Sequence, residues 1–213
     1  MKKIIDLNTW ERKDYYQFFM QLDIPQYSVQ LNLEVKPLYD YVKKEKLSFY
    51  HTFMHTVLKV VNRQQNFKYR IENDGVVYYD VIHASFTDRI ENTKLFKYVF
   101  NLYQEDLKNF VNTGKDKSIR QGSRFLNVEE ENRNDVIYFS TMPTVFFTAA
   151  TQVMNVNKKD AIPKMGWGQF KEIEQKLVIP FNLVVNHAFV DGIHVEEFLA
   201  DLQTEINQFN QVS

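Results

Sequence analysis

The chain of 213 residues has no cysteine, only six glycines and no long uninterrupted apolar run. The absence of cysteine excludes disulfide bonds, thiolate catalysis and cysteine-ligated zinc. So few glycines leave little room for the glycine-rich loops that bind phosphates or dinucleotides, and neither fingerprint occurs. A membrane helix needs roughly 18 consecutive apolar residues, so we expect no membrane span.

Charge of either sign is not in excess. Lysine and arginine number 26, aspartate and glutamate number 27, and the net charge is −1. This balance lacks the electrostatic footprint of a nucleic-acid-binding protein, so we expect no nucleic-acid partner. The opening residues, MKKIID, lack the long apolar segment of a secretion signal. We therefore expect a soluble, cytoplasmic protein.

Hydrophobic and aromatic residues are plentiful. The hydrophobic fraction is 44%, with 18 phenylalanines and 12 tyrosines. A chain of this length buries roughly 70% of its unfolded surface, so a full core is feasible. Aromatic side chains fill cores and line pockets, and we expect most of them in a phenylalanine-rich core. Because no linker or repeat interrupts the chain, we expect a single domain over residues 1–213.

The hydrophobic periodicity predicts mixed helices and strands. Helices are expected over residues 9–20, 37–44, 48–62 and 104–112 and after residue 192. Strands are expected over residues 27–35, 67–71, 76–79, 81–87, 94–100, 136–140, 144–148, 162–168 and 177–186. Asn73-Asp74-Gly75 predicts a hairpin, and residues 113–134 are expected to be the end of a helix and an exposed loop. Without strict β-α-β alternation, the pattern favours an α+β two-layer sandwich: a mixed β-sheet with helices packed on one face.

A histidine follows directly after the expected buried strand over residues 177–186. His187 is followed by Asp191-Gly192 and then by an amphipathic helix. A histidine held at a strand end titrates near neutrality and can accept a proton. The Asp-Gly pair turns the chain, and aspartate can cap the helix. The pattern indicates a candidate active site; the alternative is a buried histidine that only satisfies a hydrogen bond.

Other polar residues are weaker candidates by themselves. Ser140 ends an apolar strand, where a hydroxyl can donate to developing negative charge, and no Gly-x-Ser-x-Gly elbow supports a serine nucleophile. His51 and His55 share one helix face at a spacing that can bind zinc, but a packing or surface role is favoured and no metal is expected. Arg12 by itself is typical of a solvated charge on a helix, and two histidines have no obvious partner in the sequence, His83 and His194.

Together these residues resemble the trimeric type of the chloramphenicol acetyltransferase family. The family signature Gln-x-His-His-Ala-x-x-Asp-Gly-Phe-His is similar to residues 184–194, VVNHAFVDGIH. Other families that handle acyl-CoA share His-x-x-x-Asp-Gly, so the order of several matches carries the resemblance. The further matching segments are Ile5-Asp6 with Trp10, Arg12 and Lys13; Phe86-Thr87 with Phe96; Phe139-Ser140-Thr141-Met142-Pro143; and Pro163 with Gly168-Gln169-Phe170.

The resemblance implies a role for each matching residue. His187 would be the general base for the acceptor hydroxyl, and Ser140 would donate a hydrogen bond to the tetrahedral oxyanion. Asp191 would pair with Arg12 to hold the turn in shape and would not relay a proton. The implied acceptor-pocket residues are Phe18, Phe19, Tyr27, Thr87, Phe96 and Tyr138. The residues implied to border the coenzyme A tunnel are Tyr50 and Phe170.

The resemblance also implies a fold like that of CoA-dependent acyltransferases, with acetyl-CoA as cosubstrate. Family members are homotrimers in which His187 of one chain would face a pocket built largely by its neighbour. The implied reaction is acetyl transfer to a hydroxyl of chloramphenicol, which inactivates the antibiotic. The alternatives are an O-acetyltransferase for another hydroxylated small molecule, a non-catalytic CoA-binding trimer, and a 2-oxoacid dehydrogenase acyltransferase core. The lack of a lipoyl-domain segment and linker counts against the last.

Several positions depart from the family pattern. Asn186 replaces the first histidine of the pair, which is not the base, so catalysis can survive. Gly166 stands where the family often has threonine near the reaction centre, so a hydroxyl or water contact is expected to be missing. The other departures are Ile193, Thr144, Tyr138, Ala150 and Gln152. The chemistry is therefore expected to be kept in a reshaped acceptor pocket.

Overall fold

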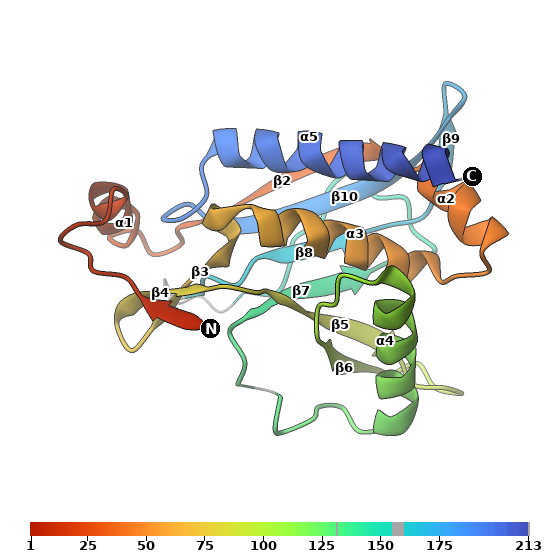
Figure 1. Ribbon diagram of the computed structural model, residues 1–213, viewed down its shortest axis with the longest axis horizontal. Coiled ribbons are helices and arrows are strands. Elements are labelled where there is room, and N and C mark those ends of the chain that lie inside the picture. The colour runs from red at the N-terminus through yellow and green to blue at the C-terminus, as the bar shows by residue number, and fades with distance from the viewer. Residues whose placement is uncertain (131, 155–159, 213) are drawn as a thin grey trace.

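The computed structural model describes residues 1–130, 132–154 and 160–212, and it shows a layer of strands and a layer of helices (Figure 1). In this part of the chain the main sheet has seven strands. β5, β7 and β8 are parallel, and the remaining neighbours are antiparallel. The spatial order is β2 (Gln26–Glu34), β10 (Lys176–Asn186), β8 (Lys164–Trp167), β7 (Val136–Thr141), β5 (His83–Arg89) and β6 (Phe96–Asn101), with β9 (Lys171–Ile173) also paired to β10.

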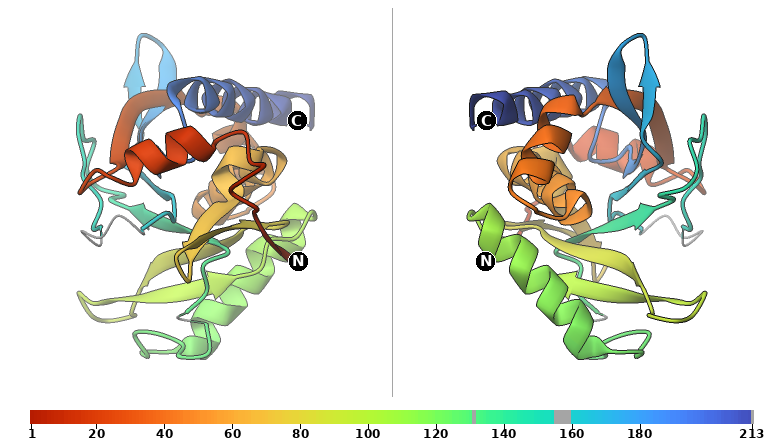
Figure 2. Two further views of the ribbon diagram at one scale, coloured as in Figure 1. Left: turned by 90° about the vertical axis from the view of Figure 1, so that its left-hand side faces the viewer. Right: turned by 90° about the vertical axis from the view of Figure 1, so that its right-hand side faces the viewer.

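The helical layer covers one face of this sheet. It contains α2 (Lys36–Lys44), α3 (Phe49–Arg63), α4 (Leu107–Gln121) and α5 (Gly192–Gln208), and α3 contacts each of the other three. The side views show these helices together on the same side of the strands (Figure 2). α1 (Lys13–Phe19) lies apart from this layer and buries none of its residues. The predicted α+β architecture with helices on one face is confirmed.

The core lies between the two layers and is rich in phenylalanine, as expected. Phe53 of α3, Phe181 of β10 and Phe198 of α5 are fully buried; the Phe181 ring contacts Phe53 edge to face and stacks on Phe198. Aromatic packing of this kind adds to the free energy gained by removing apolar area from water. No helix among the described residues is both long and apolar enough to cross a membrane.

A second, smaller sheet pairs β1 (Lys2–Ile4), β4 (Gly75–Tyr79) and β3 (Tyr69–Glu72) in that order. The hairpin predicted between β3 and β4 forms, with Asn73 and Asp74 at positive φ as a type I′ turn requires. β1 has only three residues and all of them are exposed, so its sequence lacks the alternating apolar pattern that predicts a strand. Its pairing with β4 fixes the start of the chain beside the hairpin.

Several expected elements differ in the structure. The strand expected from residue 67 begins at Tyr69, because Gln65–Lys68 form a 3-10 helix. The first helix begins at Lys13 instead of residue 9, because the preceding residues form turns. α4 runs on to Gln121: its charged residues face solvent while Phe110, Val111 and Gly114 are buried. Residues 144–148 do not form a strand. β8 already pairs with β7 on one side and with β10 on the other, so it offers this segment no free edge, and the segment is a loop.

Candidate active site

His187 follows the last residue of β10, at the place where the chain leaves the sheet. Residues 178–186 are all buried, which fixes the strand in position. The backbone N–H of His187 donates to the carbonyl of Pro25 at 2.8 Å, and the N–H of Ala188 donates to Asn186 Oδ1 at 2.9 Å. Asn186, one of the departures from the family pattern, therefore holds the turn that presents His187.

Two aromatic rings enclose the His187 imidazole. Phe19 stacks on it at a centroid distance of 4.1 Å, and Tyr27 lies tilted against it at 4.7 Å. Nδ1 is buried, lies 3.3 Å from Asp191 Oδ1 and makes no hydrogen bond with the described residues. Because Nδ1 is buried while 37% of the side chain is exposed, the accessible edge of the ring is the one that carries Nε2. Nε2 is the nitrogen that can accept a proton from a substrate.

Asp191 and Arg12 form a bidentate ion pair behind the histidine. The guanidinium donates to the two carboxylate oxygens at 2.7 and 3.0 Å, and its Nε donates to the carbonyl of Ala188 at 3.4 Å. The hydrogen bond from Arg12 holds the pKa of Asp191 below its usual value. A fork-shaped, nearly buried guanidinium that binds the carboxylate and the turn backbone together fixes the shape of the turn. The structure contains the Arg12–Asp191 contact, and the role of this pair in supporting a site stays a prediction.

His194 and Tyr27 complete this half of the site. The backbone N–H of Asp191 donates to His194 Nδ1 at 2.9 Å, which closes the first turn of α5. The hydroxyl of Tyr27 donates to the carbonyl of Val190 at 3.2 Å, so both residues brace the loop between His187 and α5. Burial, and next the nearby Asp191 carboxylate, raise the pKa of Tyr27 to about 12, so the hydroxyl stays protonated as a donor.

Ser140 lies in β7 and lines a cavity of about 750 Å³. Three predicted acceptor residues line the same cavity: Thr87, Phe96 and Tyr138. His187 is not among the described residues that line it. Among the described residues, the cavity with Ser140 and the histidine with Phe19 and Tyr27 are therefore two separate groups of candidate site residues.

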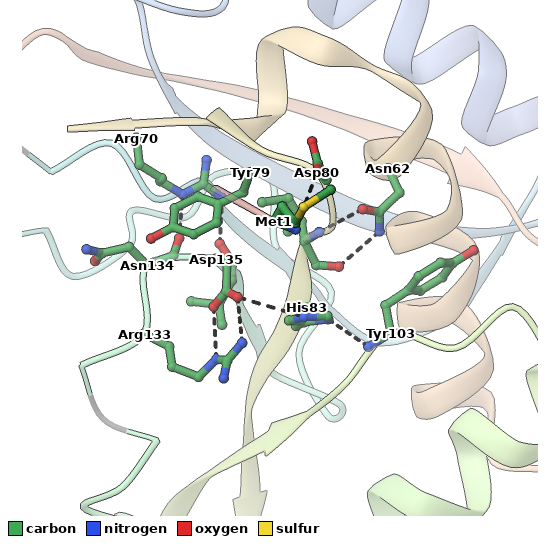
Figure 3. Close-up of polar contacts among 12 residues, drawn as sticks. Met1, Asn62, Arg70, Tyr79, Asp80, His83, Tyr103, Arg133, Asn134 and Asp135 are labelled. Atoms are coloured by element: carbon green, nitrogen blue, oxygen red, sulfur yellow. Dashed lines mark hydrogen bonds and ion pairs between the residues drawn. The ribbon is translucent and has the colours of Figure 1, made fainter. Parts of the chain in front are cut away.

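A polar cluster around the buried Arg70 fixes the start of β7 and one wall of the cavity (Figure 3). Arg70 is 1% exposed and donates to the carbonyls of Asn134 and Val136 at 2.7 Å each. Asp135 pairs with Arg133 and lies 3.8 Å from His83 Nε2, while His83 Nδ1 accepts the N–H of Tyr103 at 3.0 Å. His83, which has no evident partner in the sequence, thus has two in the fold.

Gly166 lies beside Ser140 in the sheet, where β7 and β8 are paired. A Cβ atom added to Gly166 would lie only 2.6 Å from Gln152 Nε2, which also lines the cavity. The space that a side chain at 166 would take is therefore filled by a carboxamide from the loop after β7. The expected loss of a polar contact at Gly166 is offset by a polar group from elsewhere in the chain.

The remaining predicted site residues lie elsewhere. Phe18 packs edge-on against Phe19 and is 60% exposed. Tyr50 packs against Trp167 and does not line the cavity, and its hydroxyl donates to the Thr87 carbonyl at 2.8 Å. Phe170 packs against the rings of Tyr39 and Phe49. The acceptor role of Phe18 and the coenzyme A roles of Tyr50 and Phe170 stay predictions.

The helical histidines His51 and His55 are packing residues, as favoured above. Both are buried in α3; His51 Nδ1 lies 3.0 Å from Ser48 Oγ, and His55 Nε2 lies 2.9 Å from the Gln104 carbonyl. Burial lowers the pKa of His51 to about 4, so its imidazole is neutral at pH 7.

Comparison with known proteins agrees with this geometry. The family model described as Chloramphenicol acetyltransferase matches residues 2–203. A chloramphenicol acetyltransferase of Proteus mirabilis is 25% identical over 201 residues, covering 94% of this chain and 92% of that protein. One of Clostridium butyricum is 26% identical over 204 residues, covering 94% and 92%.

Solved structures point the same way. A chloramphenicol acetyltransferase structure superimposes with a TM-score of 0.88 at 26% identity, covering 97% of this chain and 100% of that one. The truncated catalytic core of a 2-oxoacid dehydrogenase complex from Thermoplasma acidophilum gives a TM-score of 0.71 at 15% identity, covering 98% and 99%. The second likeness shows only a shared fold. Because the family model matches residues 2–203, nearly the whole chain, the chain belongs to the chloramphenicol acetyltransferase family.

Proposed function

We propose that this protein transfers the acetyl group of acetyl-CoA to a hydroxyl of chloramphenicol within a ternary complex. The observation that carries the proposal is the presentation of His187: its Nδ1 edge is buried against Asp191, and its Nε2 edge is accessible. The Arg12–Asp191 pair holds this arrangement, and Ser140 opens onto a cavity large enough for a drug-sized acceptor. Membership of the family supports the same reaction.

The chemistry follows from these groups. Nε2 of His187 takes the proton as the acceptor oxygen attacks the thioester carbonyl carbon, forming a C–O bond and an oxyanion. The Ser140 hydroxyl donates to that oxyanion, a contribution typically of about 3 kcal/mol. Collapse restores the carbonyl and breaks the C–S bond, and the imidazolium returns the proton to the leaving thiolate. The products are the acetyl ester and coenzyme A with a free thiol.

The proposal includes a homotrimer in which His187 of one protomer meets the Ser140 cavity of its neighbour. It is supported by the separation of the two parts, because His187 is not among the described residues that line the cavity. A closed cyclic assembly can bring a histidine from each chain to the cavity of the next. The cytoplasmic location stays a prediction.

The test is release of free thiol from acetyl-CoA in the presence of chloramphenicol. The wild-type protein is expected to release thiol in step with acetyl-ester formation, and His187→Ala and His187→Gln are expected to lose at least about a thousandfold in kcat. Unfolding midpoints close to wild type show that both variants are folded. Thiol release that persists in both variants would contradict the role of His187.

A second candidate is the same reaction on a more polar hydroxylated acceptor. The cavity wall favours it, because charged residues lie beside the aromatic ones: Arg70, Glu130, Arg133, Asp160 and Lys164. A panel of hydroxylated acceptors distinguishes the two candidates. Turnover of a polar acceptor with none of chloramphenicol would select the second.

A further inference from the structure

A row of residues crosses four adjacent strands of the main sheet at the level of Ser140. Ser140 in β7 pairs with Gly166 in β8, Gly166 pairs with Asn182 in β10, and Asn182 pairs with Gln30 in β2. Paired residues on neighbouring strands point to the same face of a sheet. The hydroxyl of Ser140 therefore stands at one end of a polar row in which only Gly166 lacks a side chain.

The loop after β7 lies across this row and is fixed by it. The N–H of Ala150 donates to Gln30 Oε1 at 2.6 Å, and Asn182 Nδ2 donates to the Ala150 carbonyl at 3.1 Å. A carbonyl only accepts, so Asn182 must turn Nδ2 toward Ala150 and Oδ1 toward Gln152. Gln152 accordingly donates its Nε2–H to Asn182 Oδ1 at 3.2 Å. The orientation of the Gln152 carboxamide is thus set by the network.

The absence of a side chain at residue 166 makes room for this carboxamide. A Cβ atom there would lie 2.6 Å from Gln152 Nε2 and 3.0 Å from the Ser140 carbonyl oxygen. Carbon atoms do not approach that closely without displacement, so a larger residue at 166 and the observed place of Gln152 exclude one another. Gln152 occupies the position next to Ser140 that residue 166 leaves vacant.

We propose that the Gln152 carboxamide is a second hydrogen-bond donor to the tetrahedral oxyanion, alongside Ser140. Nε2 carries two hydrogens, and among the described residues only Asn182 accepts one of them. Both Gln152 and Ser140 line the cavity in which the reaction is placed. A donor whose orientation is fixed beforehand costs little reorganisation as negative charge develops. This inference rests on the proposed acetyl transfer and adds a catalytic residue to it.

The first test compares two substitutions by steady-state kinetics. Gln152→Leu keeps the size and removes the donor, and it is expected to lower kcat by about tenfold to a hundredfold while KM for both substrates changes less than about twofold. Gln152→Glu puts a negative charge there and is expected to lower kcat further. Gln64→Leu, the same change at the end of α3, is the matched control and keeps the wild-type kcat.

The second test uses stability and does not depend on activity. Gly166→Ser is expected to lower the unfolding midpoint because its Cβ meets the carboxamide. In Gln152→Ala/Gly166→Ser the carboxamide is gone, so the double variant is expected to lose less stability than the two single losses added together. Additive losses would show that residues 152 and 166 do not compete for space and would overturn the proposal.

The kinetic measurements test the role of Gln152 directly. A Gln152→Leu protein with the wild-type kcat, or with a change in KM alone, would overturn the role of Gln152 as an oxyanion donor. If the wild-type protein releases no thiol with any acceptor, the proposed function fails and the role of Gln152 fails with it. In that case coupling between residues 152 and 166 in the unfolding experiment still distinguishes the packing of the row from its chemistry.

Discussion

The Asp191 carboxylate is placed to shape the turn and not to carry a proton. Both of its oxygens accept from Arg12, and His187 Nδ1 lies near one of them without a hydrogen bond. An ionised carboxylate held this way stays charged and keeps its orientation while the imidazole gains and loses its proton. In the proposed reaction, proton removal therefore falls to His187 and not to Asp191.

Removal of the Arg12 guanidinium leaves the Asp191 carboxylate without its partner. Arg12→Ala is expected to lower the free energy of unfolding by about 3 kcal/mol, because a largely buried ion pair loses one member. It is also expected to lower kcat by at least about tenfold, because the turn that carries His187 loses its brace. Denaturant unfolding and thiol release measure the two effects.

Lys36→Ala is the matched control for that experiment. Lys36 and Asp40 form an exposed i, i+4 pair on α2, and such pairs contribute less than about 1 kcal/mol. An Arg12→Ala protein no less stable than Lys36→Ala would show that the Arg12–Asp191 pair does not hold the turn.

The same carboxylate predicts a pH dependence of stability. Arg12 lowers the pKa of Asp191 in the folded protein from its ordinary value of 3.8. The unfolded chain therefore binds the proton at a higher pH than the folded one, so the stabilisation is present above about pH 4 and is lost as pH falls below it. Asp191→Asn is expected to lack this contribution. A wild-type free energy of unfolding that falls no faster than that of Asp191→Asn between pH 4 and pH 2 would contradict the linkage.

At the scale of an element, Gly168 positions the loop that follows β7. A Cβ atom on Gly168 would overlap the carbonyl oxygen of Val145 and lie 2.7 Å from Pro180 Cγ. The same carbonyl of Val145 accepts the N–H of Gln169 at 2.8 Å. The loop and β10 can approach this closely only because residue 168 has no side chain.

Gly168→Ala is accordingly expected to lower the free energy of unfolding by about 1–3 kcal/mol through overpacking. Gly75→Ala is the matched control, because its Cβ would lie 3.6 Å from its nearest neighbour among the described residues, the Glu72 carbonyl oxygen, which is an ordinary contact. Chemical denaturation of both variants measures the difference. Equal stability of the two would show that close packing at Gly168 is not needed.

At the scale of the whole molecule, the division of the site between protomers can be tested by mixing two inactive chains. His187→Ala and Ser140→Ala subunits are co-expressed with different tags, and mixed assemblies are purified through both tags. A mixed trimer is expected to contain about one intact site in three, with His187 from one chain and Ser140 from the other. Thiol release well above that of either variant alone is the expected result. Mixed assemblies no more active than Ser140→Ala alone would place both groups of a working site in one chain.

The sequence predicts the fold where the pattern is local. Strand and helix periodicity identify β10, α3 and α5, and the Asp-Gly pair correctly marks the start of the last helix. Periodicity could not give the loop over residues 144–148, because its sequence is as apolar as a strand and its conformation depends on which neighbours β8 already has. The sequence did not predict the full length of α4, because polar residues outnumber buried ones along this helix and obscure its apolar face.

In the candidate site, too, the sequence predicts some features and misses those that depend on segments distant in the chain. The Arg12–Asp191 pair was available from the family resemblance and is present. The stacking of Phe19 on His187 has no sequence signal, because it depends on how α1 approaches the end of β10 in space. The hydrogen bond that His194 Nδ1 accepts from the Asp191 N–H is instead local, because the two residues lie three positions apart in the first turn of α5. The filling of the Gly166 position by Gln152 depends likewise on the path of a loop.

The Arg12–Asp191 pair joins residues 179 positions apart. As the chain is synthesised, α1 is made early and buries none of its residues, while Asp191, the carboxylate partner of Arg12, is made only just before the last helix begins. The contact that braces the histidine is thus one of the most distant along the chain, and such contacts form late because a large loop must close first. A polypeptide that ended before residue 191 could contain all the described strands and still lack the ion pair that braces the turn after His187.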